Sequence, residues 1–64
     1  MMTIIIRQTS ETNFAEMPIG VLVEIDSLAD FARKHDAVID GNTLTCEWGN
    51  GEGEDVFEFE VIGE

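Results

Sequence analysis

The sequence has little cysteine, few basic residues and no long apolar run. Its single cysteine, Cys46, excludes a disulfide within the chain, and Cys46 with the single His35 cannot form a zinc cluster. A chain of 64 residues buries only about 60% of its unfolded surface, so it is marginally stable without such help. Its core must therefore come from aliphatic and aromatic side chains, which are plentiful enough to predict a folded domain.

The apolar run near the N-terminus covers only Ile4–Ile6 and is followed by Arg7. It is shorter than the apolar region of a signal peptide, and no run approaches the ~20 residues of a membrane span. With a lone thiol and no leader, the sequence predicts a cytoplasmic protein with a single domain, residues 1–64.

Basic residues are the scarcest feature, because Arg7, Arg33 and Lys34 face fourteen acids and the net charge is −11. Such a surface repels phosphates, which argues against direct binding to DNA or RNA and against anionic membranes. Two interpretations remain open. The acids could be a solvated surface that keeps the protein soluble, or they could fit a partner with a basic groove.

The last strand, Val56–Ile62, alternates with period two, which is typical of a strand with one buried and one wet face. Its faces are Phe57, Phe59 and Val61 on one side and Glu58, Glu60 and Ile62 on the other. Carboxylates at alternate positions lie ~6.7 Å apart on such a strand. A DNA strand carries one charge per ~3.4 Å, so neighbouring acidic strands could imitate its charge density.

Patterns of the same kind predict the other elements. The strands are Thr3–Gln8, Ile19–Ile25, and a hairpin of Ala37–Ile39 and Thr43–Trp48 around an Asp-Gly turn. Between them, Ser27–His35 resembles a capped helix with a narrow apolar stripe.

The sequence therefore predicts an α+β fold, a small antiparallel β-sheet with one short α-helix packed on one face. The residues expected in the core are Phe57, Phe59, Leu44, Trp48, Val21 and Val23, packed on Leu28 and Phe31. If that face is buried, Glu24, Glu47, Glu58 and Glu60 share the other. Like charges destabilise a sheet, so this arrangement suggests that the surface has a use.

The stretch Gly49–Asp55 is predicted to be a flexible acidic loop. Its glycines suggest a phosphate cradle, but it has acids and no lysine. Its oxygen ligands suggest calcium, but the spacing does not fit an EF-hand. A mobile hairpin loop or an acidic arm of a binding surface fits the composition better.

No catalytic motif is present, so we expect no enzyme, no cofactor and no metal. No nucleophile or carboxylate is placed beside His35, and alternation puts Cys46 in the core. Trp48 is expected in the core or at the rim of an interface. Phe14 and Met17, if exposed beside the acids, would provide an apolar anchor for a partner.

The chain resembles the small acidic anti-CRISPR proteins of phages, in particular inhibitors of type I-C systems. The resemblance is one of plan: chain length, strands around the short helix Ser27–His35, and acidic strands such as Glu58-Phe59-Glu60. It implies binding to a CRISPR surveillance complex, at the subunit that reads the protospacer-adjacent motif, so that target DNA is blocked. Together with the acidic strands, it predicts a monomer that acts as a DNA mimic. The expected contacts are Glu24, Glu47, Glu52, Glu54, Asp55, Glu58 and Glu60. The alternatives are a cation-binding module and an acidic, antitoxin-like interaction domain.

Overall fold

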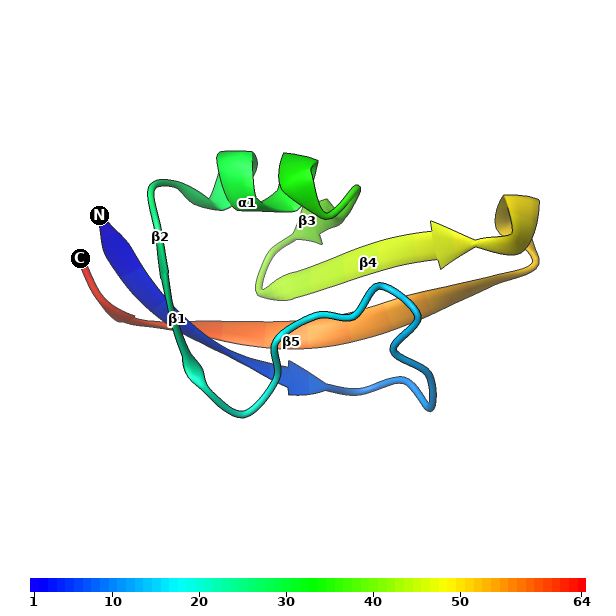
Figure 1. The fold of residues 1–64 in the computed structure, drawn as a ribbon, viewed down its shortest axis with the longest axis horizontal. Coiled ribbons are helices and arrows are strands. Elements are labelled where there is room, and N and C mark those ends of the chain that lie inside the picture. The colour runs from blue at the N-terminus through cyan, green and yellow to red at the C-terminus, as the bar shows by residue number, and fades with distance from the viewer.

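A computed structural model describes the whole chain, Met1–Glu64, as one antiparallel sheet with one α-helix (Figure 1). The strands are β1 (Met2–Gln8), β2 (Leu22–Ile25), β3 (Val38–Asp40), β4 (Thr43–Trp48) and β5 (Gly53–Gly63). The helix is α1 (Leu28–Lys34), and a 3₁₀ turn, η1 (Gly49–Gly51), joins β4 to β5. The five strands are ordered β2-β1-β5-β4-β3, which confirms the predicted fold class.

The long strand β5 is the centre of the sheet. It pairs with β4 from Gly53 to Glu58 and with β1 from Phe57 to Gly63. Because Ile4 pairs with Val61 while Thr3 pairs with Gly63, Ile62 is the extra residue of a bulge. Both chain termini lie at this end of the molecule (Figure 1).

One face of the sheet is buried, and its centre is fully inaccessible to solvent. Ile4, Ile6, Leu44 and Phe57 are each 0% exposed. The helix covers this face with Phe31 and Ala32, and the loop between β1 and β2 covers it with Met17. Fully burying a large apolar side chain contributes about 1.5–3 kcal/mol, so these contacts dominate the stability of the fold.

The helix begins and ends where its capping residues predict. Ser27 has an extended backbone, and its hydroxyl accepts a hydrogen bond of 3.1 Å from the Asp30 N–H. At the other end the His35 N–H bonds to the carbonyls of the last turn, and Asp36 follows with φ +53°. The prediction of a capped helix between Ser27 and His35 is confirmed.

Two details of the prediction are wrong. Strand β2 begins at Leu22 because Gly20 turns the chain with φ +75°, and so Val21 is 53% exposed and not in the core. Gly49–Asp55 is not a flexible loop, since its first half is the turn η1 and its second half belongs to β5.

None of the helices combines the length and the apolar character that crossing a membrane requires.

Candidate interaction surface

The face of the sheet opposite α1 carries no other element, and we call it the open face. Cross-strand partners point to the same side of a sheet, so the register identifies its members. They are Thr3, Ile5, Arg7, Leu22, Glu24, Val38, Asp40, Thr43, Thr45, Glu47, Glu54, Val56, Glu58 and Glu60. All of these are exposed or half-buried.

Five of the seven predicted contact residues lie on the open face: Glu24, Glu47, Glu54, Glu58 and Glu60. A sixth, Glu52, is exposed at the end of the turn η1, two residues before Glu54. The sequence pattern missed Asp40, which pairs with Thr43 across the β3–β4 turn. Because partners share a face and Thr43 points outward, the hairpin register could have revealed this acid.

The acids of the open face form separate groups and not the continuous grid that their spacing suggested. At one end Glu47 lies directly opposite Glu54. The next acids along β5 are Glu58 and Glu60. At ~3.3 Å per residue, Glu58 lies about 13 Å from Glu54, and Glu60 lies further away. The row Val56–Thr45–Val38 lies between the two groups and carries no charge.

Basic side chains compensate only a small part of this charge. Arg7 is on the open face, and its Nη2 atom lies 2.9 Å from Oε2 of Glu58. Arg33 and Lys34 both pair with Asp30 on the helix. Since the chain has only three Lys and Arg residues, the facing carboxylates of Glu47 and Glu54 have no cationic partner.

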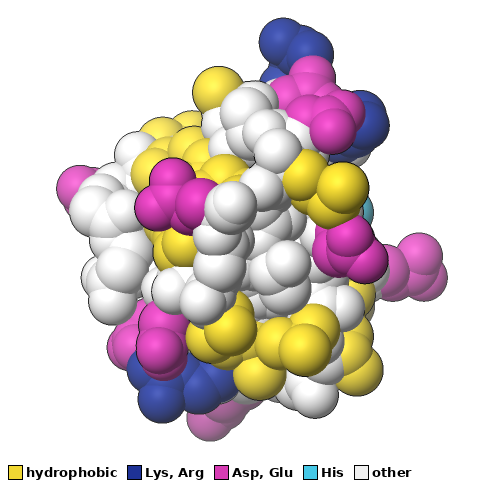
Figure 2. Space-filling model, turned by 90° about the vertical axis from the view of Figure 1, so that its left-hand side faces the viewer, with side chains coloured by type: hydrophobic (Ala, Val, Ile, Leu, Met, Phe, Trp, Pro, Cys, Tyr) yellow, Lys and Arg dark blue, Asp and Glu magenta, His cyan; other side chains and the backbone are white.

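Apolar side chains are also exposed on the open face. Leu22 and Val38 are each 65% exposed, and Ile5 and Val56 are half-buried. At the end where β2 and the chain termini lie, Figure 2 shows hydrophobic side chains exposed among acidic ones. A partner of the open face would therefore meet carboxylates and apolar side chains together.

The remaining predicted contact, Asp55, is a correction, because it is 0% exposed and points into the core side of the sheet. Its carboxylate accepts hydrogen bonds from Thr12 Oγ1, from the Ala15 N–H (2.8 Å) and from Trp48 Nε1 (3.1 Å). Asp55 thus ties the β1–β2 loop to β4 and β5 and cannot touch a partner.

The hydrogen bonds also decide the charge state of Asp55. Burial alone raises the pKa of its carboxyl group, but the bonds from Thr12, Ala15, Trp48 and the Phe14 backbone together hold the pKa below its ordinary value. The group is therefore a buried carboxylate whose lone pairs are satisfied, which is a structural role.

Cys46 contacts the backbone of His35, in an environment that disfavours its ionised form. The pKa of the Cys46 thiol is raised by burial and further by the negative charges of Asp55 and Asp36. Its Sγ lies 3.6 Å from the backbone carbonyl of His35, whose ring packs on Phe31. This environment disfavours the thiolate, which is the reactive form of cysteine.

No three or more His, Cys, Asp and Glu side chains are grouped so that they could hold a metal ion.

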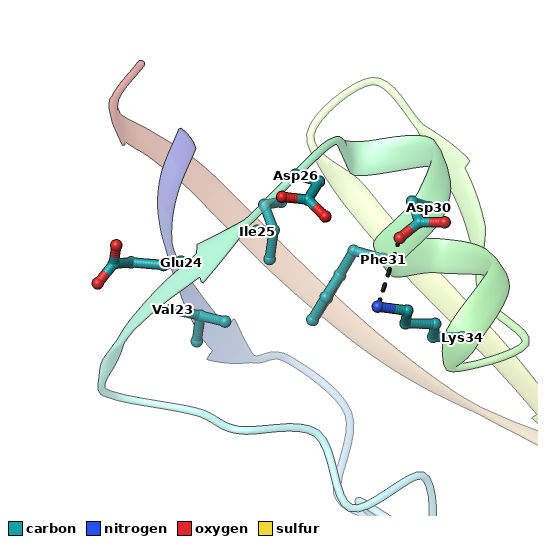
Figure 3. Close-up of a pocket in the computed structure, with 7 residues that line it drawn as sticks. All are labelled: Val23, Glu24, Ile25, Asp26, Asp30, Phe31 and Lys34. Atoms are coloured by element: carbon teal, nitrogen blue, oxygen red, sulfur yellow. Dashed lines mark ion pairs between the residues drawn. The ribbon is translucent and has the colours of Figure 1, made fainter. Parts of the chain in front are cut away.

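A cavity of about 180 Å³ lies between β2 and α1 (Figure 3). Val23, Ile25 and Phe31 form its apolar floor. Of its acids, Asp30 is paired with Lys34 (3.4 Å), and Glu24 points away from the helix in Figure 3.

Comparison of the chain with protein-family models, with curated proteins and with solved structures gives no match.

Proposed function

We propose that this protein is a non-enzymatic inhibitor that presents its open face to the basic groove of a DNA-binding protein. The observation that carries the proposal is the pair Glu47 and Glu54, which face each other on adjacent strands without a cation. Like charges directly opposite each other destabilise a sheet. Lysine or arginine side chains of a partner would remove that repulsion on binding.

The whole charge distribution supports the same proposal. With a net charge of −11 and all its Lys and Arg residues already paired, the free protein would be steered toward a basic groove. In that groove its carboxylates would take the place of phosphates. Binding would therefore weaken steeply with added salt, as DNA binding does.

The specific partner we propose is a type I CRISPR surveillance complex, at the subunit that reads the protospacer-adjacent motif. The resemblance to small acidic anti-CRISPR proteins supports this choice: a chain of 64 residues with acidic strands around one short helix. Such an inhibitor would act in the cytoplasm of a bacterial host and keep target DNA from the complex.

One observation favours a second candidate, an antitoxin-like domain that binds another protein through apolar contacts. Leu22 and Val38 are 65% exposed on the open face and could be buried by such a partner. That association would depend only weakly on salt, because apolar burial is not screened as charge pairs are.

A pair of double variants tests the proposal. Glu47→Lys/Glu54→Lys should abolish binding to a purified type I-C surveillance complex, measured by surface plasmon resonance. Glu11→Lys/Glu64→Lys changes the net charge equally but lies outside the open face, so it should retain most of the affinity. Equal losses in both variants would show that only net charge matters and would remove the assigned surface. Binding that survives both variants and high salt would favour the antitoxin-like candidate.

A further inference from the structure

A cavity of about 190 Å³ lies beside the last residues of β4, away from the centre of the open face. Strand β3 pairs with β4 only as far as Thr45, so Cys46–Trp48 has no neighbouring strand on that side. The cavity is lined by Phe14, Ala15, His35, Asp36, Cys46, Glu47, Trp48 and Asp55. The cavity therefore lies between the β1–β2 loop, the end of the helix and the free edge of β4.

Two aromatic rings form part of its wall. The centroids of Phe14 and Trp48 are 5.0 Å apart, and the rings are nearly perpendicular at 78°. Phe14 is 66% exposed, although burying the large apolar surface of a phenylalanine ring is favourable. Its ring lies open to a partner while one edge contact holds it in place.

The Trp48 ring is fixed from behind by the Asp55 carboxylate, and the backbone next to Phe14 is tied to the same carboxylate. Trp48 lies so close over Gly53 that a Cβ there would be 2.3 Å from its Cζ2 atom. The buried carboxylate of Asp55 binds the Trp48 Nε1–H and also the N–H of Ala15, next to Phe14. The Trp48 side of the wall is thus preorganised, so this side chain loses little conformational entropy when a ligand binds.

The charges around the cavity are negative. Asp36 and Glu47 are exposed on its lining, and the carboxylate of Asp55 is buried behind it. Every lysine and arginine of the chain is paired elsewhere. Aromatic faces and carboxylates are the two groups that attract a cation, and a cavity that combines them repels phosphate.

We infer that this cavity binds the guanidinium group of an arginine side chain supplied by the basic partner. Arginine fits better than lysine because its planar group stacks on aromatic rings and can also bond to a carboxylate through paired N–H groups. The inference deepens the proposed function and rests on it, since it requires a basic partner. The site shares Glu47 with the open face, whereas Glu58 and Glu60 do not line it. It gives Phe14 the role of an aromatic anchor at the rim of the interface.

The test uses N-acetylarginine amide as the probe and ¹H–¹⁵N NMR of the whole protein as the readout. We expect a saturable shift of the Trp48 indole N–H and of the amides of Phe14, Ala15 and Asp36. N-acetylcitrulline amide has nearly the same shape but no charge and should give no saturable shift. N-acetyllysine amide should bind several-fold more weakly than the arginine probe.

Two variants locate the effect. Phe14→Leu keeps an apolar side chain but removes the ring, and should weaken probe binding by about fivefold or more. Because Phe14 is largely exposed, the variant should retain the amide spectrum of the folded protein. Glu58→Lys/Glu60→Lys alters the open face and should leave the affinity of the probe within about twofold, since these residues do not line the cavity.

Shifts that spread evenly over all acidic side chains, or that persist unchanged in Phe14→Leu, would overturn the inference. The outcome is separable from that of the proposed function. Probe binding at the cavity without inhibition of a surveillance complex would remove only the function. If Glu47→Lys/Glu54→Lys loses binding to the complex but the unaltered protein does not respond to the arginine probe, only the arginine site is removed.

Discussion

Glu47 on β4 lies directly opposite Glu54 on β5, and no lysine or arginine pairs with either of them. A cross-strand pair of like charges costs stability, and threonine at either position would suit the strand better. The free protein therefore retains an unfavourable contact at the surface that we propose binds a basic partner.

The first prediction concerns this pair. Glu54→Thr should raise the free energy of unfolding by about 0.2–1 kcal/mol at low salt, because the repulsion with Glu47 is removed. The gain, measured by urea denaturation, should shrink in 1 M NaCl, where charges are screened. The same variant should bind the partner less tightly. A loss of stability at low salt would show that the two carboxylates do not repel each other in the folded protein.

The second prediction concerns Asp55. Asp55→Asn turns an amide N–H₂ toward at least one of the donors Thr12, Ala15 and Trp48, and should lower the free energy of unfolding by about 1–3 kcal/mol at pH 7. The spectrum of Trp48 should change with it, since its indole N–H loses a charged acceptor. Measurement is by urea denaturation followed by Trp48 fluorescence.

The pH dependence of this effect has a definite sign. The pKa of Asp55 is lower in the folded protein than its ordinary value, so its carboxylate stabilises the fold fully above the unfolded pKa. That stabilisation is lost as the pH falls through the folded pKa, in the acid range below about pH 4. The deficit of Asp55→Asn should therefore shrink on acidification. A deficit that is constant from pH 7 to pH 3 would contradict this account.

The third prediction concerns Gly53. In Gly53→Ala the new methyl group would be 2.3 Å from Trp48 Cζ2, so the indole must move from its place against Phe14 and Asp55. We expect a loss of about 1–3 kcal/mol in the free energy of unfolding and weaker binding of the arginine probe. Gly63→Ala is the matched control, because a Cβ there meets nothing within 4 Å. Equal stability of the two variants would show that Trp48 is not fixed by Gly53.

The fourth prediction concerns Arg7, the basic residue of the open face. Its pair with Glu58 is exposed, so Arg7→Ala should change the free energy of unfolding by less than about 1 kcal/mol. Removing this positive charge should strengthen binding to a basic partner. Arg33→Ala, on the helix, is the control and should change the affinity less. Weaker binding of Arg7→Ala would show that Arg7 itself contacts the partner.

The pattern of the sequence predicted the sheet, the capped helix and the outward acids because these depend on local periodicity. Phe57 and Glu58 alternate as a half-buried strand must, and Ser27 caps its helix through a neighbour in sequence. The Asp-Gly turn likewise predicted the β3–β4 hairpin that the structure contains.

The features that the sequence pattern could not predict depend on contacts between residues far apart in the chain. Asp55 looked like one more acid in a glycine-rich loop, and only the approach of Thr12 and Ala15 makes it a buried carboxylate. The alternation of β5, which places Asp55 in phase with Phe57, was the available signal. The neutral row between the acid groups depends in turn on the register of β3, β4 and β5, which a single strand does not encode.

The most direct test of the account is competition between this protein and DNA. A fluorescent duplex with a protospacer-adjacent motif is bound to a type I-C surveillance complex, and the protein is titrated in while anisotropy is followed. We predict full displacement of the duplex, with an apparent affinity that falls steeply between 50 and 200 mM salt. Binding of the protein to the complex with the duplex still in place, or displacement indifferent to salt, would contradict the central claim that the open face occupies a DNA-binding groove.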